Sequence, residues 1–146
     1  MEAGIAFLKN PCRSRPSLEL RKEIDGESQL SAVQAMVAID RDSSETQSLL
    51  PSLVNVLRFH TDDQYGYWAM HTLMKFGASA KSVVPLLRDA LKSPRPLVRI
   101  RAVYVLEAIG PAAKDAIPDL TTLSRTEADE NLQAMILTAL ASINKN

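Results

Sequence analysis

Cysteine and aromatic residues are scarce in this chain. It has one cysteine, Cys12, and Phe, Trp and Tyr together make up 5% of its 146 residues. A cysteine without a mate fits a reducing compartment, and so few aromatics suit Leu, Ala, Val and Ile interfaces between helices better than a sheet sandwich. The 17 basic and 17 acidic residues cancel, which argues against the cationic groove of a nucleic-acid-binding protein.

Long apolar runs and catalytic motifs are also missing. No apolar run approaches the roughly 18 residues of a membrane span, and the N-terminus lacks a signal pattern, so we expect a soluble, cytoplasmic protein without a membrane partner. The sequence has no H-E-x-x-H, C-x-x-C, G-x-S-x-G or phosphate-cradling glycine loop, and His60 and His71 have no partner at ligand spacing. We therefore expect no catalytic residue, metal or cofactor.

What the sequence does contain is a repeat of 33 residues. The stretch from Trp68 to Ser93 aligns with the stretch from Arg101 to Arg125. The matched positions are Ala69 and Ala102, Leu73 and Leu106, Phe76 and Ile109, Gly77 and Gly110, Lys81 and Lys114, and Pro85 and Pro118. Apolar residues recur three and four apart, and a repeat of this length is typical of stacked helix pairs. The sequence predicts an all-α, right-handed α-solenoid.

Fainter copies of the repeat extend in both directions. We expect three full repeats and a terminal half, at about 28–61, 62–94, 95–126 and 127–146, preceded by an N-terminal cap or partial repeat at 1–27. The predicted first helices are 28–40, 64–77, 97–110 and 129–143. The predicted second helices are 47–58, 82–92 and 115–124. The expected core includes Leu73, Leu87, Leu91, Leu106 and Leu120, and Ile39 is placed on the buried stripe of the first repeat.

Glycine and proline mark the helix ends. Gly77 and Gly110 follow the apolar periodicity, where a residue without a Cβ ends a helix most easily. Pro51, Pro85 and Pro118 stand at the first turn of each second helix, where a missing N–H is tolerated. Each repeat thus has its own stop and start signals.

These residues carry a family resemblance. The pattern P-x-V-R-x-x-A-x-x-x-L-x-x-I-G-P-x-A-K-x-A-I-P-x-L, from Pro96 to Leu120, resembles the bacterial HEAT repeat of the phycobilisome-lyase type. The run from Tyr67 to Ala69, with the later Val98-Arg99-Ile100, is also similar to the HEAT segment of some bacterial sulfatases. The resemblance is specific for the fold and says little about function, because such repeats occur in regulators, scaffolds, lyases and appendages of enzymes. We expect a non-catalytic protein-interaction or scaffold module. The alternatives are the helical appendage of a larger enzyme such as a sulfatase-like hydrolase, and, after it, a HEAT-type lyase or DNA glycosylase.

Charge is arranged in two neighbouring bands. Five cations lie between positions 88 and 101, namely Arg88, Lys92, Arg95, Arg99 and Arg101. Five acids lie between positions 115 and 130, namely Asp115, Asp119, Glu127, Asp129 and Glu130. We expect adjacent repeats to neutralise each other, with Arg99 contacting Asp62, Asp63, Asp129 or Glu130. Only Arg99 keeps the family's helix-start arginine, since Gly66 occupies the matching place in the preceding repeat.

Two surfaces are candidates for binding another protein or a neighbouring domain. Second helices usually line the concave side of such solenoids, and two columns of matching polar residues end there. These columns consist of Arg58, Lys92 and Arg125, and of Asn55, Asp89 and Thr122. The other candidate is the last helix, apolar on more than one face, where Leu132 and Met135 are expected to contact a partner, including a second copy of the chain.

Overall fold

The computed structural model describes residues 37–60 and 63–145, and these residues form helices without any strand. The α-helices are α4 (Ser44–Gln47), α5 (Leu50–Phe59), α6 (Asp63–Phe76), α7 (Val84–Leu91), α8 (Pro96–Ile109), α9 (Ile117–Thr126) and α10 (Glu130–Ile143). Two 3₁₀ segments, η1 (Gly77–Val83) and η2 (Gly110–Ala116), connect α6 to α7 and α8 to α9. The prediction of an all-α protein is confirmed.

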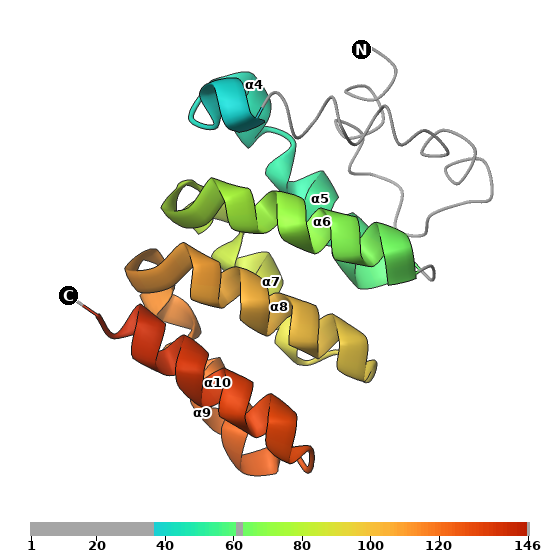
Figure 1. The fold of residues 1–146 in the computed structure, drawn as a ribbon, viewed down its shortest axis with the longest axis vertical. Coiled ribbons are helices and arrows are strands. Elements are labelled where there is room, and N and C mark those ends of the chain that lie inside the picture. Colours follow the sequence, from blue (N-terminus) through green and yellow to red (C-terminus); the bar gives the residue numbers. More distant parts are fainter. Residues whose placement is uncertain (1–36, 61–62, 146) are drawn as a thin grey trace.

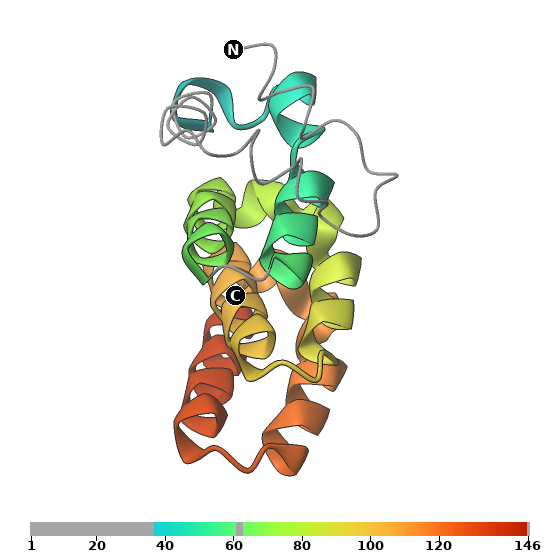
Figure 2. The ribbon, with the colours of Figure 1, turned by 90° about the vertical axis from the view of Figure 1, so that its right-hand side faces the viewer.

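The helices stack in two layers. Figure 1 shows α6, α8 and α10 side by side in front, with α5, α7 and α9 behind them. The two layers separate in the view turned by 90° (Figure 2). Each helix packs against its partner in the other layer and against the equivalent helix of the neighbouring pair, as α8 does against α6, α7 and α10. This arrangement is the α-solenoid that the repeat predicts.

Glycine and proline fix the helix boundaries as the sequence predicts. Gly77 and Gly110 have φ angles of 53° and 67°, which side chains with a Cβ rarely adopt, and each ends a front-layer helix. Pro51, Pro85 and Pro118 lie in the first turns of α5, α7 and α9. The predicted helices 64–77, 97–110 and 129–143 match α6, α8 and α10 to within one residue. The later starts of α7 and α9 reflect η1 and η2, which the sequence does not predict.

A continuous apolar core fills the space between the layers. The five leucines expected there are at most 2% exposed, and Phe76 and Ile109 close the core at the ends of α6 and α8. Burying a leucine side chain contributes roughly 1.5–3 kcal/mol. No unit of this stack can bury its apolar face alone, so the repeats depend on one another for stability.

The first repeat departs from its prediction. Ile39 is 85% exposed, so its assignment to the buried stripe is wrong, and Val37 is the buried residue at 3% exposure. Two positions along a helix differ by about 200°, so the burial of Val37 turns Ile39 to solvent. The cap or partial repeat expected at 1–27 and most of the helix expected at 28–40 lie outside the described residues, with 37–40 helical.

Candidate functional site

A recess between the C-terminal ends of α7 and α9 contains two of the residues expected to bind a partner, Lys92 and Thr122. It has a volume of about 440 Å³ and is open to solvent. We call it the α7–α9 recess. It is lined by Leu91, Lys92, Ser93, Arg99, Asp119, Thr122, Leu123, Thr126, Glu127 and Ala128.

The local sequence explains why these side chains meet. Helix α7 ends at Leu91, and the residues up to Arg95 lead into α8, so Lys92 and Ser93 form one rim. Helix α9 presents Thr122 and Thr126 one turn apart, and the loop 127–129 follows at once. The Thr122 hydroxyl donates to the carbonyl of Pro118 at 2.9 Å, and that of Thr126 donates to the carbonyl of Thr122 at 3.2 Å. Both hydroxyl oxygens keep acceptor capacity.

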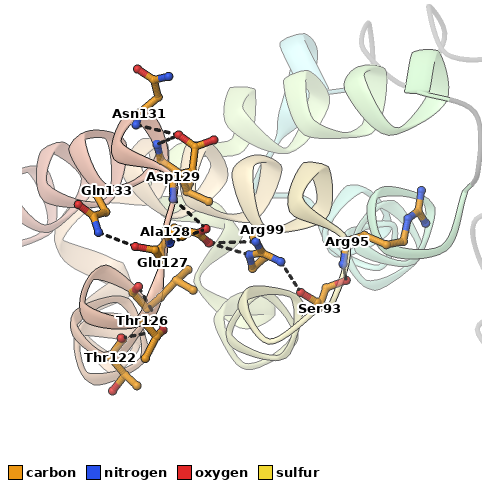
Figure 3. Close-up of polar contacts among 12 residues, drawn as sticks. Ser93, Arg95, Arg99, Thr122, Thr126, Glu127, Ala128, Asp129, Asn131 and Gln133 are labelled. Atoms are coloured by element: carbon orange, nitrogen blue, oxygen red, sulfur yellow. Dashed lines mark hydrogen bonds and ion pairs between the residues drawn. The ribbon is translucent and has the colours of Figure 1, made fainter.

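An ion pair closes the inner wall of the recess. Arg99 contacts Glu127 Oε2 through Nη2 at 3.0 Å and through Nε at 3.1 Å, and its Nη1 donates to the carbonyl of Ser93 at 3.0 Å (Figure 3). The other carboxylate oxygen, Oε1, accepts the backbone N–H groups of Ala128 and Asp129 at 3.1 and 3.3 Å. Arg99 and Glu127 thus join α8 to the loop before α10.

The expectation that Arg99 contacts an acid of an adjacent repeat is confirmed, but the acid is Glu127 rather than Asp63, Asp129 or Glu130, and the fourth candidate, Asp62, lies outside the described residues. Asp129 is instead the N-cap of α10, since its carboxylate accepts the N–H of Asn131 at 2.8 Å and of Leu132 at 3.3 Å. Such a cap satisfies donors that the first helical turn leaves unpaired. The carboxylate of Glu127 contacts Arg99 of α8 and also binds its own loop, and neither set of contacts could be predicted from residue spacing.

Ionic contacts to Asp119 form the opposite side of the α7–α9 recess. Arg88 Nε donates to Asp119 Oδ2, and Lys92 Nζ lies 3.9 Å from Asp119 Oδ1. The hydrogen bond to Asp119, followed by the charge of that carboxylate, raises the pKa of Arg88 above its ordinary value. Because Arg88 and Arg99 hold the acids of the next pair of helices, the basic and acidic bands neutralise each other in part, as expected.

Two other cations of the basic band bind the preceding repeat. Arg95 donates from Nη1 to the carbonyl of Arg58 and from Nη2 to the carbonyl of His60, both at 3.3 Å. Figure 3 shows Arg95 pointing away from Arg99, towards the end of α5. Arg101 donates from Nη2 to the carbonyl of Asp63 at 2.9 Å and lies 3.4 Å from its carboxylate. The band therefore connects repeats on both of its sides.

The remaining polar candidates follow the second-helix layer. Arg58 and Arg125 lie in the last turns of α5 and α9, and Lys92 directly follows α7. Asn55 is half-buried on α5, whereas Asp89 is exposed on α7. The guanidinium carbon of Arg58 lies 4.9 Å from the ring centroid of Phe59. The structure thus brings Lys92 and Thr122 into one recess and distributes the others along the stack.

The terminal helix needs a correction. Leu132 is 2% exposed, so the expectation that it lies on an uncovered apolar surface is wrong, and Met135 is half-buried against the core. Leu132 shares one face of α10 with Ile136, Ala139 and Ile143, all of which are buried. The exposed apolar side chain is Leu137, at 60%. Contact of Met135 with a partner stays a prediction.

The histidines take part in ring contacts. His60 is 1% exposed and its ring lies 4.7 Å from that of Tyr65, while the His71 ring meets the edge of Tyr67 at 4.3 Å. Within residues 37–60 and 63–145, no three His, Cys, Asp or Glu side chains come together as metal ligands would. None of the helices in this part of the chain is long and apolar enough to cross a membrane.

Comparison with known families bears on this arrangement. Residues 50–141, more than half of the chain, match the family model described as HEAT repeats. The matched range includes both layers from α5 into α10 and therefore the whole α7–α9 recess. A comparison with curated proteins finds no match.

Proposed function

Because the chain belongs to the HEAT-repeat family, we propose that it is a non-catalytic module that binds another protein through the outer surface of α5, α7 and α9. Repeats of this family commonly serve protein interaction. We also propose that the chain is divided into repeats at about 28–61, 62–94, 95–126 and 127–146. The protein binds its partner in the cytoplasm, a reducing compartment that suits the single Cys12. The proposal assigns no cofactor and no catalytic residue to the chain.

The observation that supports this choice of surface is the α7–α9 recess. It combines the flexible cation Lys92, whose side chain is 67% exposed, with hydroxyl groups of Thr122 and Thr126 and the apolar side of Leu123. A pocket with a few polar groups around apolar side chains can fix the orientation of a bound segment. The Arg99–Glu127 pair gives this recess a rigid inner wall, so little ordering is required on binding.

A site-specific photo-cross-linker tests the proposal. The reactive side chain replaces Thr122 in one variant and Tyr104, which is 37% exposed on α8 in the other layer, in the control. We expect specific protein adducts from position 122 in cells and few from position 104. Adducts that are equally frequent at both positions, or that form from position 104 alone, would contradict the proposal.

A helical appendage of a larger enzyme, such as a sulfatase-like hydrolase, is the second candidate. Leu137 favours it, because its 60% exposure leaves apolar surface on α10 where the equivalent Val103 of α8 is fully buried. A neighbouring domain could cover such a side chain. The full reading frame decides between the two candidates, since the appendage requires an enzyme domain in the same chain.

A further inference from the structure

Three cations stand at matching places at the C-terminal ends of the second-layer helices. They are Arg58 on α5, Lys92 after α7 and Arg125 on α9. Among the residues that the structure describes, the guanidinium groups of Arg58 and Arg125 form no hydrogen bond or ion pair, and Lys92 is held only by the 3.9 Å contact with Asp119. Their charge is therefore available to a ligand.

Two acids close to this row, Asp119 and Glu127, already form ion pairs with other arginines. Arg88 holds Asp119, and Arg99 holds Glu127, which also accepts two loop N–H groups. Asp89, exposed one turn before Lys92, is the uncommitted acid on α7. Helices α5, α7 and α9, together with Lys92, carry four cations (Arg58, Arg88, Lys92 and Arg125) and two acids (Asp89 and Asp119), so this layer of helices has an excess of positive charge although the whole chain is neutral.

The spacing of the row defines the geometry of a ligand. Helices α5, α7 and α9 pack consecutively, and neighbouring helix axes lie about 10 Å apart. A peptide in the polyproline II conformation advances about 3.1 Å per residue with three residues per turn, so every third side chain lies on the same face. Successive cations therefore correspond to every third residue of a polyproline II segment that crosses the helix ends.

We infer that the segment bound by this surface is an acidic peptide in the polyproline II conformation with a carboxylate at every third residue. The inference rests on the proposed function and names the chemistry of its partner. The carboxylates pair with Arg58, Lys92 and Arg125, and a side chain between the last two enters the α7–α9 recess beside Leu123. The oxygens of Thr122 and Thr126 accept N–H groups of the bound backbone.

Fluorescence anisotropy with a synthetic peptide tests this inference. The labelled probe has glutamate at every third position with proline and serine between, because proline favours the polyproline II conformation, which places every third side chain on one face. The matched control peptide has the same composition with its glutamates consecutive. We expect the probe to bind more tightly than the control and to weaken as salt is added, since exposed charges are screened.

Single variants assign the binding to the row. Replacement of Arg58, Lys92 or Arg125 by Ala should each weaken the probe about two- to five-fold, as expected for exposed ion pairs. Lys81→Ala, which removes an exposed cation on η1, is the control and should leave binding unchanged. Circular dichroism verifies that each variant keeps its helices.

Three results would overturn the inference. The first is that the probe does not bind, and the second is that the peptide with consecutive glutamates binds equally well. The third is that a single-stranded oligonucleotide of equal charge binds as tightly, which would indicate a general polyanion-binding surface. These results are separate from the proposed function, because cross-linking from Thr122 reports on proximity to a protein partner whatever its charge. Adducts from position 122 without probe binding would leave the proposed function standing and reject the acidic peptide.

Discussion

The guanidinium of Arg101 occupies the space in which a side chain at Gly66 would begin. A Cβ on Gly66 would overlap with Nη1 and Cζ of Arg101. Arg101 comes from α8 and Gly66 from α6, so the absence of a side chain in one repeat admits an arginine from the next. The Arg101 side chain is 7% exposed and donates to the carbonyl of Asp63.

This relationship predicts that Gly66 and Arg101 are coupled energetically. Gly66→Ala adds a good helix former, which alone would stabilise α6 by about 0.5–1 kcal/mol. In the natural chain we expect the opposite, a loss of about 1–2 kcal/mol, because the methyl group displaces a buried, hydrogen-bonded guanidinium. Urea denaturation gives the free energy of unfolding.

The Arg101→Ala background is the control for that experiment. There the displaced group is absent, so Gly66→Ala should be neutral or stabilising, and the two substitutions should couple by at least about 1 kcal/mol. If Gly66→Ala stabilises the chain in both backgrounds, the contact between the two repeats has no energetic role.

The buried ion pair of the recess gives a second prediction. Glu127→Ala should lower the free energy of unfolding by about 3 kcal/mol, because it leaves Arg99 uncompensated in a largely buried place. Asp129→Ala removes only a helix cap and should cost about 1 kcal/mol. Denaturant titration of both variants ranks them, with the exposed Glu130→Ala as a reference expected to change little. An equal effect for all three would reject the role given to Glu127.

Much of the fold could be predicted from the sequence because its signals are local. Gly77 and Gly110 stop helices, and Pro85 and Pro118 start them, through backbone constraints that act within one turn. The role of Glu127 depends on where a loop passes over another repeat, which spacing cannot reveal. Gly66 was visible as a departure from the family pattern, yet its purpose required Arg101 to be placed beside it.

The candidate site was predicted in part for the same reason. Matching positions identified Arg58, Lys92 and Arg125 as one row, since a repeat places equivalent residues at equivalent places. The burial of Leu132 and the exposure of Leu137 on α10 could not be derived, because that helix is apolar on several sides. Packing against α8 and α9 decides which side is covered.

The core gives a third prediction. Leu106 is fully buried in α8. Its replacement by Ala should lower the free energy of unfolding by about 2–5 kcal/mol, because apolar burial is lost and a cavity is left behind. Leu137→Ala on α10 should change stability by less than about 0.5 kcal/mol, as for other surface substitutions. Thermal and urea unfolding of the two variants measures the difference. A loss below about 1 kcal/mol for Leu106→Ala would contradict the assignment of the core.

The terminal helix gives a fourth prediction. Leu132→Glu should destabilise the fold, because it places a carboxylate among buried apolar side chains. Leu137→Glu should leave the unfolding transition nearly unchanged. Calorimetry measures the stability of both variants, and sedimentation measures their oligomeric state. Equal stability of the two variants would show that Leu132 is not part of the core.

Binding affinity of the partner identified by cross-linking tests the central claim most directly. Titration calorimetry compares the natural chain with Thr122→Trp, which fills the α7–α9 recess without adding charge, and with Tyr104→Trp, which adds the same side chain to the other layer. We predict that Thr122→Trp weakens binding by at least about tenfold, equivalent to about 1.4 kcal/mol, while Tyr104→Trp leaves it unchanged. Unchanged affinity for Thr122→Trp, or a larger loss for Tyr104→Trp, would contradict the assignment of the binding surface to α5, α7 and α9.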